Sequence, residues 1–329
     1  MTLIDKARTL LGFPEPAPQW PPESLSLALQ GGGSFGAFTW GVLDRLLEER
    51  GTRFDAISGS SAGAVNAAVM VSGLIEGGRE GARMRLASFW KRVSRSAGFL
   101  PLPAPPGLDL LLRTVSPYQL NPFNVNPLRE ALEAEVDFEA LRTRSPVKLL
   151  VGATRVRDGR LRVLANAELS VEAILASACL PLLHHTIELD GEAYWDGGYA
   201  ANPPLIPLVR ASEAAHMLIV QLTPVIAERA PQGPREIARR LEQIQFNATL
   251  NSELEALKFG KLLGATEKLK RLRIGRIAAE EQLEGLARES AANLGWDFLQ
   301  RLRDAGREAA GVWLARDVPA GRAGGEAPL

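Results

Sequence analysis

The sequence is poor in the two residue types that most often bind metals or form cross-links. It has one cysteine, Cys179, and three histidines among 329 residues. A single cysteine excludes an internal disulfide framework and a cysteine-based metal site. We therefore expect no metal and no other cofactor, and a reducing compartment is compatible with this composition.

Long apolar runs and an imbalance of charge are also missing. The chain has no run of about 18 or more apolar residues, the length that a membrane-spanning helix needs. Residues 1–20 lack the apolar core of a secretory signal and are interrupted by prolines. Basic and acidic residues balance at 38 each, so no global charge favours nucleic acid. We expect a cytoplasmic protein that binds no nucleic acid; peripheral membrane contact and a homo-oligomer stay open.

Residues 54–63 predict a strand, a tight turn and a helix. The apolar run Phe54 to Ile57 meets Gly59-Ser60-Ser61-Ala62-Gly63, and helix-forming residues follow up to Val71. Glycines on both sides of Ser61, at G-x-S-x-G spacing, permit a sharp bend that holds the serine hydroxyl clear of the sheet edge. Free amides at the start of the helix would favour developing negative charge there. Taken alone, the pattern also fits a plain turn of small residues.

A second strand–turn–helix unit precedes the serine turn. Residues 24–30 predict a strand, Gly31-Gly32-Gly33-Ser34-Phe35-Gly36 follows, and residues 37–49 carry a helical apolar stripe. The spacing of a dinucleotide-binding turn is met, but no acidic residue closes a second strand about 20 residues later as that fold requires. The Gly-Lys-Ser/Thr of a phosphate-binding loop is absent. The glycine loop can also be interpreted as a row of backbone N–H groups that bind an oxyanion. Nucleotide binding by this loop is the weaker alternative.

An aspartate outside any predicted hairpin is the candidate base. The pairs Asp158-Gly159 and Asp190-Gly191 lie between strand-like segments and predict hairpins. The third pair, Asp196-Gly197-Gly198, runs into Asn202-Pro203-Pro204 instead. Because no turn explains Asp196, a catalytic role for its carboxylate gains weight.

Two mechanisms remain open for a serine nucleophile. A Ser–His–Asp triad would use His184, His185 or His216. A Ser–Asp dyad would use Asp196 directly, and partial burial would have to raise the pKa of that carboxyl above its reference value near ~3.9.

The three motifs together resemble the patatin-like phospholipase family. Their order and their strand–turn–helix settings match that family, residues 176–181 also look like it, and the resemblance covers about residues 24–225. It implies an α/β fold, namely a patatin-type three-layer α/β/α architecture with a mainly parallel central sheet and a largely helical C-terminal extension. It also implies a hydrolase that cleaves lipid acyl esters.

The same resemblance implies roles for individual residues. Ser61 would be the nucleophile and Asp196 the base. The oxyanion N–H groups would come from Gly31, Gly32, Gly33 and Ser34; Gly59 and Gly63 would shape the nucleophile elbow, and Gly197 and Gly198 would complete the Asp-Gly motif. One position departs from the family, because Phe35 stands where Arg or Lys is usual. Backbone donors are then the main electrostatic stabilisation, and recognition of a phosphate head group is in doubt.

The remaining segments suggest a four-part organisation. We expect an N-terminal segment with a short helix at 2–12 and a proline-rich linker over residues 1–23, a catalytic domain at 24–225, a mainly helical region packed on it at 226–318, and a flexible tail at 319–329. The apolar, proline-rich stretch 98–127 fits a lid or lipid-facing flap, or a loop folded over the core. The basic stretch 268–276 fits an edge strand or a contact with anionic head groups.

Two further functions use the same residues. An acyltransferase or thioesterase on the same core would use a histidine base. A catalytically inactive lipid-binding protein would keep the fold without turnover.

Overall fold

The computed structural model describes residues 20–97, 116–227, 229–283, 285–286 and 289–315. Several predictions from the sequence concern other residues and lie outside this described part. They are the helix at 2–12, most of the linker, residues 98–115 of the proline-rich stretch, and the tail at 319–329.

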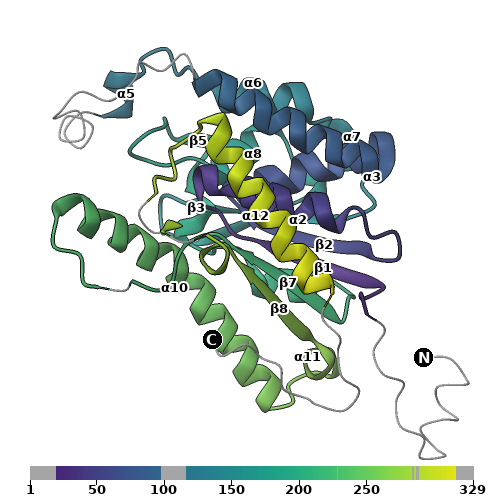
Figure 1. The fold of residues 1–329 in the computed structure, drawn as a ribbon. Coiled ribbons are helices and arrows are strands. Elements are labelled where there is room, and N and C mark those ends of the chain that lie inside the picture. The colour runs from purple at the N-terminus through teal and green to yellow at the C-terminus, as the bar shows by residue number, and fades with distance from the viewer. Residues whose placement is uncertain (1–19, 98–115, 228, 284, 287–288, 316–329) are drawn as a thin grey trace, which may run out of the picture.

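One sheet of eight strands forms the centre of the described chain (Figure 1). The strand order is β5-β6-β3-β2-β1-β7-β8, with β4 paired to β3. Strands β1, β2, β3, β7 and β8 run parallel, while β4, β5 and β6 pair in antiparallel fashion. The strands are β1 (Ser24–Leu29), β2 (Arg53–Ser60), β3 (Lys148–Arg155), β4 (Leu161–Ala165), β5 (Ile187–Leu189), β6 (Glu192–Asp196), β7 (His216–Gln221) and β8 (Arg273–Ala278).

Helices cover both faces of the sheet, as the predicted three-layer α/β/α architecture requires. Leu27 and Leu29 of β1 pack in the larger core, whereas Ala28 between them packs in the second core, because successive strand residues point to opposite faces. The larger core holds α2 (Gly36–Leu46), α3 (Ala62–Ala97), α6 (Pro127–Glu135), α7 (Phe138–Thr143), α8 (Val171–Ser177) and α12 (Trp296–Leu314). The second core holds α9 (Leu205–Ala211) and α10 (Pro234–Leu262).

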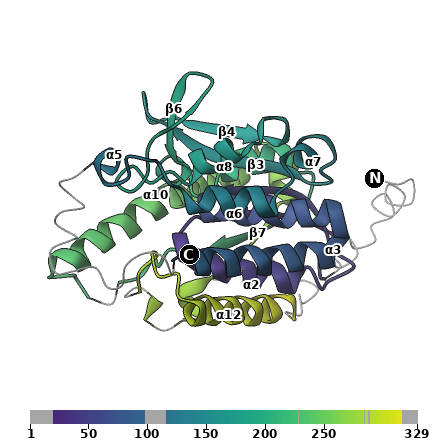
Figure 2. The same ribbon diagram turned by 90° about the horizontal axis from the view of Figure 1, so that it is seen from above.

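On the larger face, α12, α2, α3 and α6 lie next to one another in that order (Figure 2). The contact between α12 and α2 is close because both helices have a glycine at the crossing. A Cβ on Gly41 would lie 1.9 Å from the carbonyl oxygen of Arg303, and one on Gly306 would lie 2.1 Å from that of Phe38. A side chain at either glycine would therefore push α12 off the domain.

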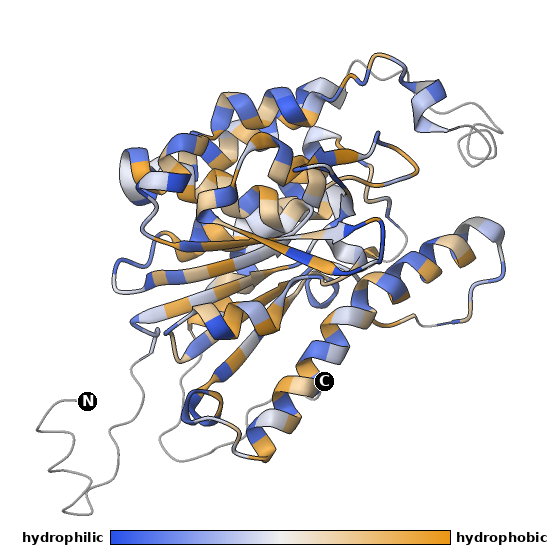
Figure 3. Ribbon diagram, turned by 180° about the vertical axis from the view of Figure 1, so that it is seen from behind, coloured by the Kyte–Doolittle hydropathy of each residue, from blue (hydrophilic) through white to orange (hydrophobic). Residues whose placement is uncertain are grey.

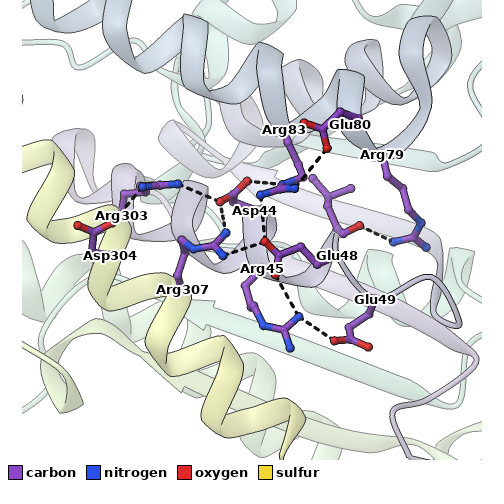
Figure 4. A network of polar contacts seen from close by, with 11 residues as sticks. Asp44, Arg45, Glu48, Glu49, Arg79, Glu80, Arg83, Arg303, Asp304 and Arg307 are labelled. Carbon is purple, nitrogen blue, oxygen red and sulfur yellow. Dashed lines mark hydrogen bonds and ion pairs between the residues drawn. The ribbon is translucent and has the colours of Figure 1, made fainter.

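A buried carboxylate strengthens this attachment. Asp44 of α2 accepts hydrogen bonds from Arg83 of α3 at 2.7 Å and from Arg303 of α12 at 3.3 Å, and also from Arg307 (Figure 4). Glu48, in the turn that follows α2, pairs with Arg83 at 2.9 Å and with Arg307 at 2.8 Å. The two carboxylates thus connect this end of α2 to α3 and α12 through charge.

The predicted Asp-Gly turns agree with the structure. The two Asp-Gly hairpins join β3 to β4 and β5 to β6, and the side chain of Asn126 caps α6 by accepting the amide of Leu128 at 3.1 Å. Strand β8 lies at the sheet edge, as one interpretation of residues 268–276 expects, and follows the short helix α11 (Glu267–Arg271).

Three features differ from the sequence pattern. The helix predicted to follow the serine turn up to Val71 is part of a longer element, α3, which is interrupted by the non-helical residues Gly77 and Gly78. Helix α9 is not indicated by the pattern, because three prolines lie at 203, 204 and 207 around its first turn, where proline is tolerated. A short helix, α5 (Pro117–Leu120), lies within the stretch 98–127.

The strand register brings the three motifs to one edge of the sheet. Leu29 at the end of β1 lies opposite Gly59 of β2, so the glycine loop and the serine turn follow neighbouring strand ends. Asp196 ends β6 opposite Ala153 of β3. The carboxyl ends of parallel strands are where α/β folds bind ligands.

Candidate active site

Ser61 lies at the apex of a tight turn between β2 and α3. Its φ of +52° falls in the left-handed region, which is uncommon for a residue other than glycine and marks a constrained position. The turn packs directly on β1, because a Cβ on Gly63 would lie 2.0 Å from the carbonyl oxygen of Leu29. The Ser61 amide donates to both the carbonyl oxygen and the hydroxyl of Ser177, at 3.1 and 3.0 Å.

Gly59 is required for the same turn. A Cβ there would lie 2.6 Å from the amide nitrogen of Ala64, so the strand and the first turn of α3 approach too closely for a side chain. The Ser61 side chain itself is 8% exposed. The serine hydroxyl is therefore held on a rigid turn with limited access to solvent.

Asp196 is fully buried and held from three sides. Its amide donates to the carbonyl oxygen of Cys179 at 2.8 Å, its carbonyl oxygen accepts from the hydroxyl of Thr154 at 2.7 Å, and its Oδ1 accepts from the amide of Gly198 at 2.7 Å. Within the described residues, no donor lies at hydrogen-bond distance from its Oδ2. The Ser61 hydroxyl nonetheless lies near enough to lower the pKa of this carboxyl group.

Burial sets the acidity of this carboxyl group. Desolvation raises the pKa of Asp196 from 3.8 to about 7, against the opposing effects of the Ser61 hydroxyl and the Gly198 amide. The charge of Glu242 on α10 adds to the rise. The local packing demands two glycines, since a Cβ on Gly197 would lie 2.1 Å from the carbonyl oxygen of Gly152, and one on Gly198 would lie 2.4 Å from the ring of Phe246.

The four predicted oxyanion residues divide into two pairs. The Gly31 amide donates to Oδ1 of Asn202 at 2.7 Å, and the Ser34 amide donates to the carbonyl oxygen of Ala291 at 2.8 Å. The amides of Gly32 and Gly33 have no acceptor in the part of the chain that the structure describes. Two adjacent N–H groups of the loop, directly after Gly31, thus have no acceptor in the described chain.

A group of buried amide side chains behind the glycine loop is not indicated by the sequence motifs. Asn202 also donates from Nδ2 to the carbonyl oxygen of Phe246 on α10, at 3.3 Å. The next residue, Asn247, accepts at Oδ1 from Gln30 at 3.1 Å and from Gln221 at 3.0 Å. Asn202 stands shortly after the Asp-Gly pair in the sequence, but its contact with Gly31 spans 171 positions, which a single sequence does not reveal.

The three histidines have other partners. His184 accepts at Nδ1 from the amide of Leu180 at 3.2 Å, and Nε2 of His185 lies 3.2 Å from the carbonyl oxygen of Pro117. His216 begins β7 opposite Leu25, at the other end of the strands from Ser61. In the described chain, no histidine is hydrogen-bonded to Ser61 or to Asp196.

Phe35, the residue that departs from the family pattern, is a core side chain. It is buried and packs edge-to-face against Phe298 of α12, with ring centroids 6.4 Å apart. Position 35 therefore brings neither a charge nor a polar group to the glycine loop.

Other site types find little support in the described residues. No group of three or more His, Cys, Asp or Glu side chains there could hold a metal ion. Cys179 is a buried free thiol, and burial raises the pKa of its thiol to about 11. Among the described helices, none combines the length and apolar character that crossing a membrane would need.

Comparison with known proteins gives a family and two structural likenesses. The family model described as patatin-like phospholipase matches residues 27–209, more than half of the chain. The crystal structure of VipD from Legionella pneumophila matches with a TM-score of 0.40 and 17% identity, over 87% of this chain and 68% of that one. The ExoU–SpcU complex of the type III secretion system of Pseudomonas aeruginosa matches with a TM-score of 0.39 and 16% identity, over 89% of this chain. This chain spans about half of that protein, 51%. A search of curated proteins found no match.

Proposed function

Because this chain belongs to the patatin-like phospholipase family, we propose that it hydrolyses lipid acyl esters with Ser61 as nucleophile and Asp196 as base. One observation carries the proposal. The fully buried carboxylate of Asp196 lies near the Ser61 hydroxyl, and its Oδ2 has no hydrogen-bond donor in the described chain. A buried polar atom without a partner is unfavourable, and a reacting serine would account for it.

The chemistry follows from this arrangement. Ser61 Oγ attacks the ester carbonyl carbon while its proton passes to Asp196, and the negative charge that forms on the carbonyl oxygen is met by the amides of Gly32 and Gly33. Collapse of the tetrahedral intermediate breaks the bond to the alcohol oxygen, which takes the proton from Asp196. Water then attacks the acyl-serine, Asp196 removes a proton from it, and the fatty acid leaves as that proton returns to Ser61.

The environment of Asp196 suits this role. A general base works best when its pKa lies near the operating pH, and burial brings the pKa of Asp196 to about 7. An aspartate with its ordinary pKa would be ionised but too weak a base for a serine hydroxyl. The dyad therefore needs no histidine.

Replacement of the two reacting groups tests the proposal. Purified protein is assayed on phospholipids, lysophospholipids, acylglycerols and nitrophenyl esters of graded chain length. Ser61→Ala and Asp196→Asn should each lose at least about 1,000-fold in kcat. Ser26→Ala is the matched control, because Ser26 is a buried serine of the same sheet whose hydroxyl donates to the His216 carbonyl oxygen, away from the site. Ester hydrolysis that survives in Ser61→Ala contradicts the proposal.

We further propose that the lipid reaches Ser61 across an apolar rim. Exposed large apolar side chains gather on three segments beside the site: Tyr118, Phe123, Val125, Leu182, Leu183, Ile237, Leu241 and Ile244. Helix α5 and the N-terminal half of α10 lie on the same side of the molecule (Figures 1 and 2), and apolar residues recur along α10 (Figure 3). Large exposed apolar areas mark interaction sites.

Contacts on two sides connect this rim to the chain neighbours of Asp196. On α10, Phe246 lies against Gly198, two residues beyond the rim residue Ile244. On the other side, the hydroxyl of Tyr118 accepts the amide of Thr186 at 3.2 Å, and Thr186 accepts from the indole of Trp195 at 3.1 Å. A partner that covers both sides would also cover the site, so a lipid surface that itself supplies the substrate fits this rim.

The introduction of negative charge on α10 tests the rim. The double variant Ile237→Glu/Leu241→Glu should lower the ratio of vesicle-phospholipid hydrolysis to soluble-ester hydrolysis by about 10-fold or more, since two large side chains lose their apolar contact. The matched control is Phe259→Glu/Leu262→Glu, which charges exposed apolar residues at the far end of the same helix. Equal ratios in the two double variants would contradict a lipid-facing rim.

A further inference from the structure

The glycine loop is held at its two ends and free in its middle. At the first residue, the Gly31 amide donates to Asn202 Oδ1, and at the last, the Ser34 amide donates to the Ala291 carbonyl oxygen. Between them, Gly32 and Gly33 have no amide acceptor in the described chain. The direction of these two free N–H groups is therefore set by the anchors on either side of them.

Asn202 makes the shorter of these two contacts, at 2.7 Å, and it is the one made by a side chain. The residue is fully buried, and its side chain makes one other hydrogen bond within the described chain, the donation to the Phe246 carbonyl oxygen at 3.3 Å. Gly31 lies between this side chain and the nucleophile, because a Cβ on Gly31 would be 3.2 Å from Asn202 Oδ1 and 2.8 Å from Ser61 Cβ. Any shift of Asn202 would thus be felt by the loop at the point nearest to Ser61.

The support of Asn202 comes from α10. Phe246 binds Asn202 through its carbonyl oxygen, and the adjacent Asn247 binds Gln30, the residue before Gly31. Gln30 in turn accepts the amides of Leu222 and Thr223 at 2.7 and 2.8 Å. Two neighbouring residues of α10 therefore support the start of the glycine loop, Asn247 through Gln30 and Phe246 through Asn202. The buried amide side chains involved have their hydrogen bonds satisfied.

We propose that Asn202 is a positioning residue that aims the Gly32 and Gly33 amides at the oxyanion of the reaction. The inference rests on the proposed acyl hydrolase function. Asn202 touches no reacting atom; it acts through the Gly31 amide. Since the oxyanion exists in the tetrahedral state and not in the bound ester, loss of this alignment lowers kcat and spares KM.

The experiment compares two asparagines that have the same kind of backbone contacts. Asn202→Ala removes the acceptor for Gly31. Asn166→Ala is the control, because Asn166 accepts the Leu149 amide at 2.8 Å and donates to the Val147 carbonyl oxygen at 3.1 Å, at the opposite end of β3. Each variant is assayed on a soluble nitrophenyl ester, and its affinity is measured for a trifluoromethyl ketone, which forms a tetrahedral oxyanion on serine, and for the product fatty acid.

Asn202→Ala should lose about 10- to 100-fold in kcat with KM changed less than about threefold. Its affinity for the trifluoromethyl ketone should fall by the same factor, while its affinity for the fatty acid holds. Asn166→Ala should keep kcat and ketone affinity. Equal loss of kcat in both variants, or equal loss of ketone and fatty-acid affinity in Asn202→Ala, would overturn the proposal.

A second variant covers a failure of Asn202→Ala to fold. Asn202→Asp keeps the shape of the side chain but replaces the amide that donates to the Phe246 carbonyl oxygen by an acceptor, so an ionised carboxyl group there is repelled from its support on α10. Because such a shift would move the Gly31 contact, its ketone affinity should fall as pH rises and this carboxyl ionises; wild-type affinity at every pH would overturn the proposal. If wild type itself hydrolyses no ester, the proposed function is wrong. If wild type hydrolyses esters and Asn202→Ala keeps the wild-type kcat, only the role of Asn202 is contradicted.

Discussion

Asp196→Asn should stabilise the protein, and the gain should grow with pH. The reason is the burial of the carboxyl group, which raises its pKa in the folded protein from 3.8 to about 7. Below the unfolded pKa, the carboxyl is neutral in both states and the fold bears no penalty. As pH rises toward the folded pKa, the unfolded chain ionises freely while the folded chain resists, so stability is lost. An asparagine has no such titration.

The size of the effect follows from the shift. A difference of roughly three pKa units corresponds to roughly 4 kcal/mol between the two protonation states. Wild type should lose about 3 kcal/mol of unfolding free energy between about pH 5 and pH 8 through this group. The rest of the loss already occurs below about pH 5. The asparagine also keeps an oxygen that can accept the Gly198 amide, so its contacts change little.

Urea unfolding at the two pH values measures this gain. The difference in unfolding free energy between Asp196→Asn and wild type should widen by about 3 kcal/mol from about pH 5 to pH 8. All other titrating groups are shared, so they cancel in the difference. Ser61→Ala keeps the carboxyl group but loses the hydroxyl that lowers its pKa, so it should lose at least as much stability as wild type between the two pH values. A difference that is the same at both pH values would refute a buried, strongly shifted Asp196.

Three further outcomes are expected. In wild type, kcat/KM should rise about tenfold per pH unit up to about pH 7 and level off above it, because Asp196 must be ionised to accept the serine proton. A pH profile of kcat/KM that already levels off near the ordinary pKa of an aspartate would contradict this. Replacing any of the three histidines by glutamine should change soluble-ester kcat by less than about threefold, and loss with one of them would favour a triad. Asp44→Ala should lower unfolding free energy by about 3 kcal/mol, because arginines on two helices lose a buried partner, whereas Glu80→Ala, at an exposed pair, should change it by less than about 1 kcal/mol.

Short motifs with strict spacing are the part of this site that the sequence predicts well. Gly59, Ser61 and Gly63 determine one another within a single turn, and the glycines at 31–33 follow a strand whose apolar run is plain. Parallel strands then bring both turns to the same edge of the sheet. Asp196 could be singled out because, unlike the other two Asp-Gly pairs, its pair lies at no predicted hairpin turn.

Contacts between distant segments could not be predicted. Nothing local marks Asn202 or Ala291 as partners of the glycine loop, and Ser177 reaches the Ser61 amide from 116 positions away. The apolar stripe of α10 predicts a helix but not its surroundings: Leu254 and Leu257 are buried, while Ile237, at the other end, is exposed. Periodicity gives the face of a helix, whereas burial depends on what else packs there.

Covalent labelling of Ser61 tests the central claim most directly. An alkyl fluorophosphonate is added to the folded wild-type protein, and the modified residue is located by peptide mass spectrometry, with Ser61→Ala and Asp196→Asn treated in parallel. The account predicts one adduct, on Ser61, a much slower reaction in Asp196→Asn and none in Ser61→Ala. An unlabelled Ser61 in protein that hydrolyses esters, or labelling at the same rate without Asp196, would contradict it.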